Sequence, residues 1–417
     1  MIDPRILRND PAALETSLRR RGIDLDVSFL VDLDERRRLE RVKAEQIRSE
    51  QKDAGKSVAR LEGEEKQAAI ARASELSAGY KEALTVADAS DAEFNEIWET
   101  LPNLVDSTAA EGTNEEDAEL LRSWGEPADG VFLDHVALGE KHGFLDIERA
   151  AKVSGSRFGY LLGPLVRLEF GLVGYALDTL EPHGFTPVVP PVLVRDMALY
   201  GTGFFPSDRD QVYSLPADNL YLIGTSEVAL AAMHADEIFD VDDLPLRYAG
   251  FSTCFRRESG TYGQDTRGIF RVHQFDKVEM FSFVHPDTAD DEHDFLLARE
   301  EELVQRLGIP YRVMNIAAGD LGASASKKYD IEAWFPGQGR YREITSTSNT
   351  TDYQSRRLKI RYRGKEGNEL VYTLNGTAIA MARWLIAIVE NYQQPDGTIV
   401  VPDVLRDYVG FETIGSS

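Results

Sequence analysis

A long stretch without proline, from about Val27 to Leu101, constrains the fold more than any other part of the chain. It is rich in Ala, Glu, Lys, Arg and Leu, which favour helices. Small and apolar residues in its second half recur in alternating steps of four and three, which is the seam of a coiled coil. The positions of this seam are Ala69, Ala73, Leu76, Tyr80, Ala83, Ala87, Ser90, Phe94, Ile97 and Leu101.

The first half of the same stretch, about Leu30 to Leu61, has the composition of a helix but a less regular pattern. Residues 62–65 (EGEE) separate the two halves and suit a tip. We therefore predict two antiparallel helices that form an arm of roughly 45 to 50 Å, at about 1.5 Å per residue. The apolar positions of the first helix are Leu33, Leu39, Val42, Ile47, Ala54, Val58 and Leu61.

One face of the first predicted helix is basic. Arg48, Lys52, Lys56 and Arg60 recur every four residues and form the basic stripe of the arm. Two interpretations stay open: a solvated helix face with i,i+4 ion pairs, or a strip that contacts RNA phosphates. The chain carries a formal net charge of −25, which disfavours non-specific nucleic-acid binding but does not exclude a local contact.

The composition is that of an ordinary globular protein, with 42% hydrophobic and 28% charged residues. No run of about 18 apolar residues predicts a membrane span. The opening segment, MIDPRILRND, lacks the apolar core of a signal peptide. The single cysteine, Cys254, excludes an internal disulfide and a cysteine-cluster zinc site. We expect a cytoplasmic protein that does not bind a membrane.

A polar, acidic segment at residues 102–130 contains glycine and proline and indicates a linker. We predict an N-terminal domain of residues 1–110 and a second domain of residues 111–417. A helix near residues 163–181 leads into the strand-like run HGFTPVVPPVLV (183–194). Because proline cannot donate to a sheet ladder, this strand should lie at an edge or end there. An edge strand suits pairing with a second copy of the chain; the alternative is a simple turn.

The stretch from Phe255 to Phe281 predicts two strands around a long loop punctuated by Gly260, Gly263 and Gly268. Successive side chains of a strand point to opposite faces, so an antiparallel pair can bring four functional side chains together. These residues are Arg256, Glu258, Phe275 and Glu279. A purine can stack on the ring, and an arginine can grip an anion with two hydrogen bonds. The alternative is a surface hairpin with paired charges.

Two further segments place polar groups near the ends of strands. Residues 225–227 (TSE) lie between a short strand and a helix, and the alternative to a site is a helix cap by Thr225 or Ser226. The oxygens of Glu343 and Ser346 suit a hard cation. They are three residues apart, so an ideal strand would direct them to opposite faces, and a bulge is needed to bring them together.

Two basic patterns occur near the C-terminus. An almost wholly apolar helix is predicted from Gly376 to about Tyr392, with Arg383 in its middle. A buried arginine needs a buried carboxylate or an anionic ligand. Before it, an alternating basic run predicts a half-buried strand whose charged face is either solvated or in contact with an RNA end. The basic residues of that run are Arg357, Lys359, Arg361 and Arg363.

Together these motifs resemble those of bacterial-type seryl-tRNA synthetases, a family of class II aminoacyl-tRNA synthetases. HGFTPVVPPVLV resembles the first class II motif, FRRE followed by RVHQF resembles the second, and LNGTAIAMAR resembles the third. TSE at 225–227, EITSTSN at 343–349 and the helical arm resemble features of the seryl member. Thr377 departs from the pattern, since many members have serine there; threonine keeps the hydroxyl and adds a methyl group.

The resemblance implies an α+β fold: a class II catalytic domain, with an antiparallel sheet flanked by helices, and an N-terminal coiled-coil arm of two antiparallel helices. It implies a homodimer joined through the first motif. It also implies a two-step reaction in which L-serine and ATP form seryl-adenylate and diphosphate, and the seryl group then passes to the 3′ end of serine tRNA. Selenocysteine tRNA would be charged as well where the host has it.

The resemblance also implies residue roles, with Arg256 and Arg383 as the catalytic pair. Serine would be bound by Thr225, Ser226, Glu227, Arg256, Glu279, Asn375 and Thr377. ATP would be bound by Arg256, Arg257, Glu258, Val272, Phe275, Glu343, Ile344, Thr345, Ser346 and Arg383. Mg²⁺ would be held by Glu343 and Ser346, and the tRNA by the basic stripe Arg48, Lys52, Lys56 and Arg60.

Two other functions fit part of the pattern. An amino acid:carrier-protein ligase would form the adenylate but load a protein thiol, and such enzymes lack the long arm. A non-catalytic regulatory paralogue would be expected to have lost Arg256, Glu258 or Arg383, all of which are present. A resistance-conferring duplicate of the housekeeping enzyme would keep every motif.

Overall fold

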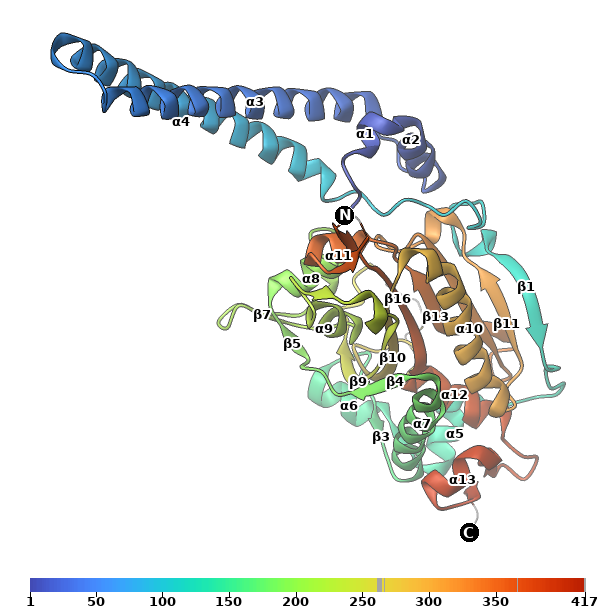
Figure 1. The fold of residues 1–417 in the computed structure, drawn as a ribbon. Helices are drawn as coiled ribbons and strands as arrows, with labels where there is room; N and C mark the ends of the chain where they lie inside the picture. The colour runs from blue at the N-terminus through green and yellow to red at the C-terminus, as the bar shows by residue number, and fades with distance from the viewer. Residues whose placement is uncertain (261–264, 266, 366, 416–417) are drawn as a thin grey trace. The chain divides into compact units, whose positions relative to one another are not determined.

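The computed structural model describes residues 1–260, 265, 267–365 and 367–415 (Figure 1). The chain forms two compact units, Ile2–Leu104 and Val105–Ser417, the second joined by Met1. The boundary between the units lies a few residues before the predicted division at 110 and 111. Of the three loop glycines that the sequence singled out, Gly263 lies outside the described residues.

The N-terminal unit is built on two long helices, as predicted. Short helices α1 (Ile6–Asn9) and α2 (Pro11–Arg20) precede α3 (Val27–Val58) and α4 (Gly63–Trp98). Asp26 caps α3, because its carboxylate accepts the backbone N–H of Ser28 at 2.9 Å. The 32 residues of α3 span about 48 Å at about 1.5 Å per residue. The turn between the helices comes slightly earlier than residues 62–65, since α4 already begins at Gly63.

The predicted seam of α4 is confirmed where the arm is best buried. Ala83, Ala87 and Phe94 are buried against α3, and the Phe94 and Trp98 rings stack with centroids 5.2 Å apart. The apolar repeat of α4 therefore predicted which of its faces meets α3.

The prediction for α3 was wrong at two apolar positions. Leu39 and Val42 are 62% and 51% exposed. The seam of α3 instead passes through Arg37, whose guanidinium carbon lies 3.9 Å from the centroid of the Phe94 ring. The carboxylate of Asp34, only 1% exposed, accepts Nη2 of Arg37 at 2.6 Å. Paired charges can occupy a helix interface when each hydrogen bond is satisfied. In α3 the Asp34–Arg37 pair faces α4, while Leu39 and Val42 face solvent.

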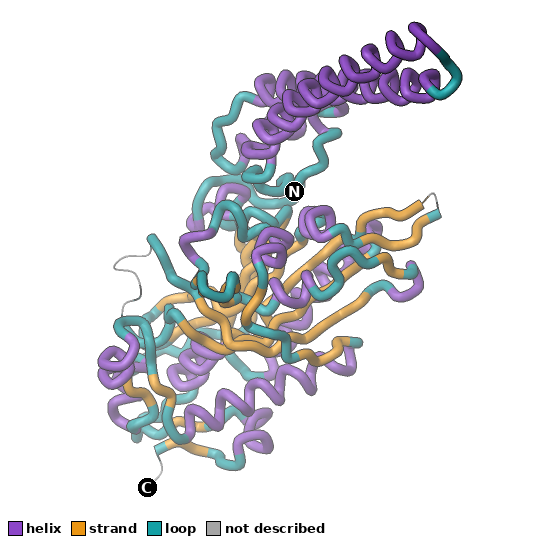
Figure 2. The backbone as a smooth tube through the Cα atoms, turned by 90° about the vertical axis from the view of Figure 1, so that its left-hand side faces the viewer, coloured by secondary structure: helices purple, strands orange, loops and turns teal. Residues whose placement is uncertain are grey.

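The C-terminal unit contains an eight-stranded sheet in the order β1-β11-β12-β13-β16-β10-β9-β4, seen as the adjacent orange strands of Figure 2. Neighbouring strands are antiparallel except β4, which pairs in parallel with β9. The short strand β4, which contains Pro187, lies at one edge as predicted. The sheet consists of β1 (Glu119–Trp124), β4 (Phe185–Val188), β9 (Leu246–Phe255), β10 (Gln274–Val284), β11 (Tyr311–Asn315), β12 (Lys327–Phe335), β13 (Arg340–Asn349) and β16 (Tyr372–Ala380).

Helices cover one face of this sheet, and α10 lies across it in Figure 1. The main core joins Leu168 of α7, Leu296 of α10 and Trp384 of α12 to strand residues such as Val278 and Met280. On β10, Lys277 and Glu279 alternate with these two residues and therefore point to the opposite face. The helices of the unit are α5 (His135–His142), α6 (Ile147–Ser154), α7 (Pro164–Leu180), α8 (Asp196–Thr202), α9 (Glu227–Ala232), α10 (Ala289–Arg306), α11 (Tyr353–Leu358), α12 (Met381–Asn391) and α13 (Asp403–Val409). Of these, α9 and α11 pack against Phe281 and Phe283 of β10, on the opposite face from the main core.

Small sheets complete the unit, and two sequence predictions fail near them. The strand predicted from Arg357 to Arg363 forms only in its second half, as β14 from Arg361. Arg357 lies at the end of α11, and Lys359 turns the chain at φ +57° between the two. The predicted helix after Gly376 begins only at Met381, because β16 continues to Ala380. The small strands are β2 (Leu145–Asp146), β3 (Tyr160–Leu161), β5 (Leu193–Val194), β6 (Ser214–Leu215), β7 (Leu220–Leu222), β8 (Ile238–Phe239), β14 (Arg361–Gly364), β15 (Gly367–Leu370), β17 (Ile399–Val400) and β18 (Thr413–Ile414).

No helix in the described part of the chain combines the length and apolar character needed to cross a membrane.

Candidate active site

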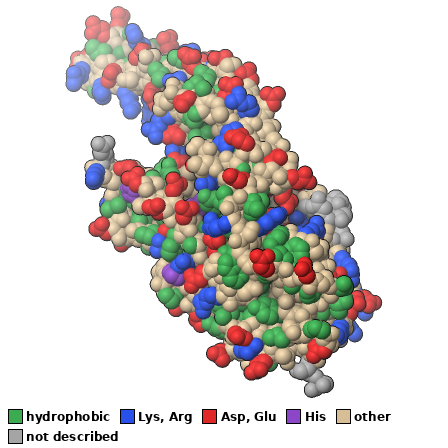
Figure 3. Space-filling model, turned by 90° about the vertical axis from the view of Figure 1, so that its right-hand side faces the viewer, with side chains coloured by type: hydrophobic (Ala, Val, Ile, Leu, Met, Phe, Trp, Pro, Cys, Tyr) green, Lys and Arg blue, Asp and Glu red, His purple; other side chains and the backbone are tan. Residues whose placement is uncertain are grey.

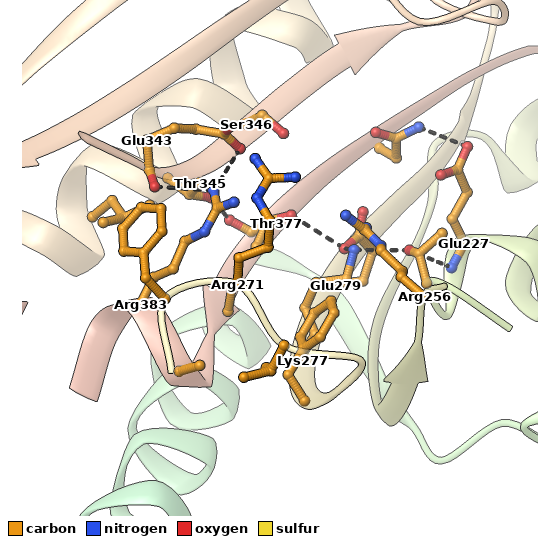
Figure 4. Close-up of a pocket in the computed structure, with 18 of the residues that line it drawn as sticks. Glu227, Arg256, Arg271, Lys277, Glu279, Glu343, Thr345, Ser346, Thr377 and Arg383 are labelled. Carbon is orange, nitrogen blue, oxygen red and sulfur yellow. Dashed lines mark hydrogen bonds and ion pairs between the residues drawn. The ribbon is translucent and has the colours of Figure 1, made fainter. Parts of the chain in front are cut away.

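A cavity of about 360 Å³ lies on the sheet face opposite the main helices, over strands β10, β13 and β16 (Figure 4). Side chains reach it from β10, from the end of β9 and from the start of α12, so distant parts of the sequence meet in it. Its lining residues are Phe204, Thr225, Glu227, Arg256, Glu258, Phe270, Arg271, Val272, Phe275, Lys277, Glu279, Lys328, Glu343, Ile344, Thr345, Ser346, Asn375, Thr377, Ala380, Ala382 and Arg383.

One end of the cavity is acidic and almost wholly buried. The Glu227 carboxylate accepts the side-chain amides of Gln354 at 2.6 Å and Asn375 at 2.9 Å, both on Oε1. Burial, and then the nearby charge of Glu279, raise the pKa of Glu227 to about 7. The hydroxyl of Thr377 donates to Glu279 at 3.4 Å. This end of the cavity suits an ammonium group and a hydroxyl group.

Lys277 is a lining residue for which the sequence analysis assigned no role. Its buried ammonium group donates to the Thr225 hydroxyl at 2.8 Å and forms an ion pair with Glu279. A buried lysine is stable only when such partners accept its protons. The alternation of β10 places Lys277 on the same face as Phe275 and Glu279, and this was the signal that could have identified it.

Arg256 stands between the two ends of the cavity. Phe275 pairs with Cys254 in the sheet, so Arg256 lies just beyond the end of β9 on the same face. Its Nε donates to the backbone oxygen of Gly224 at 3.1 Å, and its guanidinium carbon is 5.3 Å from the centroid of the Phe275 ring. Glu258, in the left-handed conformation at φ +51°, forms an ion pair with Arg271 at 2.8 Å.

The other end of the cavity is formed by a bulge in β13. Thr345 pairs with Ile331 while Glu343 pairs with the next residue of β12, which leaves Ile344 as the additional residue. This is the irregularity that the sequence analysis required for Glu343 and Ser346 to reach one site. Both residues line the cavity in Figure 4.

Arg383 is paired with a carboxylate, and its side chain is 21% exposed rather than fully buried as the sequence predicted. Its Nη1 lies 3.1 Å from Oε1 of Glu343 and donates to the backbone oxygen of the same residue at 3.0 Å. It stands in the first turn of α12 rather than in the middle of the helix. Burial opposes the charged form of Glu343, but Arg383 and Lys328 outweigh it and lower the pKa of Glu343.

The oxygens of Glu343 and Ser346 fit a magnesium ion only in part. Mg²⁺ commonly takes one or two protein oxygens and completes its shell with water and substrate phosphates. The described residues contain no cluster of three or more His, Cys, Asp or Glu side chains suited to an ion. The donor set therefore suits an ion that arrives with a phosphate ligand rather than one held by the protein alone.

Two predicted site residues lie outside the cavity. Ser226 is fully buried, and its hydroxyl donates to the backbone oxygen of Gly250 at 3.2 Å. Arg257 directs its guanidinium toward the Tyr213 ring, with the centroid 5.7 Å away. Their neighbours Thr225 and Arg256 do line the cavity.

The four residues of the basic stripe are exposed on the arm. Arg48, Lys52 and Lys56 belong to α3, and Arg60 follows its end. Lys56 pairs with Asp53 at 3.0 Å, and Arg48 lies 5.8 Å from the centroid of the Tyr80 ring. In Figure 3, Lys and Arg side chains gather along one edge of the arm.

Two family models match the chain. Residues 1–105 match the seryl-tRNA synthetase N-terminal domain, and residues 213–392 match the tRNA synthetase class II core domain (G, H, P, S and T). Curated relatives include proteins named serine–tRNA ligase from Thermobifida fusca, 51% identical over 99% of both chains, and from Streptomyces coelicolor, 50% identical over 98% of both.

Solved structures agree with this. Seryl-tRNA synthetase from Pyrococcus horikoshii, complexed with ATP, superposes with a TM-score of 0.93 at 40% identity and covers 99% of both chains. The cytoplasmic serine–tRNA ligase from Naegleria fowleri, in complex with AMP, superposes with a TM-score of 0.89 at 35% identity and covers 99% of this chain and 98% of that one.

Proposed function

Because the chain belongs to the seryl-tRNA synthetase family, which joins serine to tRNA at the expense of ATP, we propose that its cavity divides into a serine end and a nucleotide end that meet at Arg256. The serine end contains Thr225, Glu227 and Glu279, and the nucleotide end contains Phe275 and Arg383. The observation that carries the proposal is this arrangement of an acidic, buried end and a cationic end in one cavity.

The charges of the serine end match those of the amino acid. The carboxylates of Glu227 and Glu279 face the ammonium group of serine, and Lys277 offsets part of their negative charge. The carboxylate of serine lies toward Arg256, which can grip an anion with two parallel hydrogen bonds. Glu279 accepts the serine hydroxyl. Alanine lacks that hydroxyl and would leave the buried carboxylate unpaired, which gives strong discrimination.

The first step joins the two ends. A carboxylate oxygen of serine attacks the α-phosphorus of ATP, the bond from that phosphorus to the bridging oxygen breaks, and diphosphate leaves. Arg256 stabilises the charge that develops on the α-phosphate, while Arg383 holds the outer phosphates. Phe275 stacks on the adenine, Val272 contacts the nucleotide through its backbone, and Glu258 accepts the adenine amino group.

The second step transfers the seryl group. The 3′-terminal hydroxyl of the tRNA loses its proton as it attacks the carbonyl carbon of seryl-adenylate. The bond from that carbon to the bridging oxygen breaks, and AMP leaves with this oxygen, which came from the serine carboxylate. Positioning supplies most of the rate, because the side chains around the reacting groups stand on strands, at the end of β9 and on α12. Selenocysteine tRNA is a second acceptor where it exists.

Glu343 and Ser346 would hold Mg²⁺ together with the phosphates of ATP. The ion would neutralise phosphate charge when bound. Within the described chain the Glu343 carboxylate is already charged and paired with Arg383, so it is ready to accept a cation without releasing a proton. A Glu343→Gln variant should need more Mg²⁺ to protect ATP-bound protein against thermal unfolding, a measurement that does not depend on turnover.

The basic stripe Arg48, Lys52, Lys56 and Arg60 binds the tRNA backbone in this proposal. Its exposure and its net positive character support phosphate contacts. Four such contacts predict that the logarithm of the affinity falls with the logarithm of salt concentration with a slope of about −3 to −4. If the slope does not change when all four residues become glutamine, the stripe does not contact the tRNA phosphates.

A homodimer is supported by the open edge of the sheet at β4 and by exposed apolar residues of the same unit. Val189, just beyond that strand, is 81% exposed, and Phe170 on α7 is 65% exposed. Isolated exposed residues are ordinary, but an open sheet edge that continues into an exposed valine suits a second copy. Sedimentation of the protein as a monomer at micromolar concentration would contradict this. We place the work of this enzyme in the cytoplasm, where translation consumes charged tRNA.

Serine-dependent exchange between ATP and diphosphate, run beside charging of bulk tRNA, tests the whole proposal. Exchange together with charging is expected. Exchange without charging of tRNA from a matched source would favour the carrier-protein ligase, although the arm argues against it. No exchange with any amino acid would favour the regulatory paralogue.

A further inference from the structure

His135, the first residue of α5, is a buried histidine that lies between the nucleotide end of the cavity and the far end of α12. Its side chain is 7% exposed. It contacts Glu390 on one side and the segment Arg267–Phe270, which returns from the loop toward β10, on the other. It does not line the cavity itself.

The hydrogen bonds of His135 fix the positions of its ring protons. Oε1 of the fully buried Glu390 accepts the backbone N–H of His135 at 3.0 Å and lies 3.2 Å from its Nδ1. A backbone N–H can only donate, and that of Ile269 lies 3.2 Å from Nε2. Nε2 must therefore offer its lone pair, and the proton must be on Nδ1, toward Glu390.

Three consecutive residues of the returning segment contact His135 or Asp134, the residue before it. Arg267 forms an ion pair with Asp134 at 2.8 Å. Gly268, at φ +81°, packs so closely that a Cβ atom there would lie 1.9 Å from Nε2 of His135. Ile269 follows with its hydrogen bond to the ring. This close approach requires glycine, because any side chain at Gly268 would displace the histidine.

The next residue, Phe270, lines the cavity and connects this segment to two arginines. Its ring lies 3.8 Å from the guanidinium carbon of Arg342 and 4.8 Å from that of Arg383, measured to the ring centroid. Arg383 and Glu390 belong to the same helix, α12. A closed path therefore runs from Glu390 through His135 and the returning segment to Phe270, and back to α12 at Arg383.

We propose that His135 is a positioning residue for nucleotide binding: it holds the returning segment so that Phe270 supports Arg383 in the orientation that meets the phosphates of ATP. The inference rests on the proposed role of Arg383. His135 acts through the segment and touches neither substrate. The serine end is formed by other elements, so its affinity should not depend on the histidine.

Two substitutions at His135 test the two hydrogen bonds of its ring one at a time. Asparagine at 135 can reach Glu390 with its amide, in the place of Nδ1, but offers no acceptor to Ile269. Glutamine reaches the place of Nε2 and can accept from Ile269. In serine-dependent ATP–diphosphate exchange, His135→Asn should raise the KM for ATP roughly tenfold, as expected for the loss of one buried hydrogen bond. His135→Gln should raise it less, and the KM for serine should change less than twofold in both.

A histidine on the same helix provides the matched control. Nε2 of His142 lies 2.7 Å from the backbone oxygen of Gly397, and its ring is 6.0 Å from that of Phe144. His142→Asn should lower the thermal midpoint without moving the KM for ATP. Gly268→Ala tests the same contact from the loop and should raise the KM for ATP as His135→Asn does, so the proposal stays testable if one variant folds poorly.

Equal increases in the KM values for ATP and serine would overturn the proposal, and so would equal effects of His135→Asn and His135→Gln. A lower thermal midpoint with an unchanged KM for ATP would reduce His135 to a structural role. These results are distinct from a failure of the proposed function, which would appear as the absence of serine-dependent exchange in the unaltered protein.

Discussion

Glu227 should stabilise the complex with serine while destabilising the protein. Its carboxylate is buried near a second carboxylate, Glu279, and burial is the larger of the two causes that raise the pKa of Glu227 to about 7 from an ordinary 4.5. The folded protein therefore holds this proton more tightly than the unfolded chain does. The ionised carboxylate that the proposed serine site uses is disfavoured in the folded protein.

The sign and size of the effect follow from linkage. Below pH 4.5 the carboxyl group is protonated in both the folded and the unfolded state and costs nothing. As pH rises from 4.5 to 7, only the unfolded chain ionises freely, so the free energy of unfolding falls. Above pH 7 the cost reaches about 3 kcal/mol, at about 1.4 kcal/mol for each pKa unit.

A Glu227→Gln variant removes this cost. Glutamine keeps an oxygen that accepts from Gln354 and Asn375, which now donate to Oε1 of Glu227. The variant should match the parent protein near pH 4.5 and exceed its free energy of unfolding by up to about 3 kcal/mol at pH 8. At that pH it should also raise the KM for serine at least tenfold, because one charge opposite the ammonium group is lost.

Urea unfolding at a series of pH values, with ATP–diphosphate exchange at pH 8, measures both effects. Glu140→Gln, a change at an exposed residue of α5, provides the control and should leave both measurements unchanged. A stability difference between Glu227→Gln and the parent that stays constant from pH 4.5 to 8 would refute the argument from burial. An unchanged KM for serine would remove Glu227 from the serine end.

Three other predictions test the site and the arm. Arg256→Ala should abolish formation of the adenylate, and a near-normal rate of ATP–diphosphate exchange would contradict the site. Deletion of residues 35–97 should preserve serine activation but severely reduce tRNA charging; equal losses would show that the arm is structural. Phe94→Ala should destabilise the arm by about 3–5 kcal/mol, because the ring is fully buried and stacks on Trp98; faster hydrogen exchange in α4 with unchanged serine activation would support this.

The sequence predicted the arm because the repeat of α4 is local. Each small or apolar residue of that seam can be recognised without knowing its partner. The seam of α3 could not be found in this way. Arg37 is buried there because Asp34 and the Phe94 ring receive it, while the more apolar Leu39 remains exposed. The choice depends on the opposing helix, which no pattern within α3 encodes.

The site was predictable to a similar extent. The alternation of β10 correctly indicated a shared face, and the spacing of Glu343 and Ser346 required a bulge to bring the two together, which β13 contains. Lys277 shares the alternation, but a lysine in a strand is ordinarily solvated, and only the three-dimensional structure brings it to Thr225. The basic alternation was misleading only in its first half, since Arg357 lies in a helix whose Tyr353 and Leu358 are buried, whereas Arg361 and Arg363 do lie on the strand β14.

The buried carboxylates Asp34 and Glu227, one in each unit, have different kinds of partner. In the arm, Asp34 is satisfied by Arg37 and Arg38, both of α3, so its burial needs no further molecule. In the site, the described residues give Glu227 two amide hydrogen bonds and no ion pair, since the nearby Lys277 pairs with Glu279. A carboxylate retained at a cost of about 3 kcal/mol is expected where binding, rather than folding, uses the charge. In the proposed site the ammonium group of serine would supply a cation for Glu227, so saturation with serine should reduce the pH-dependent stability difference between the parent protein and Glu227→Gln.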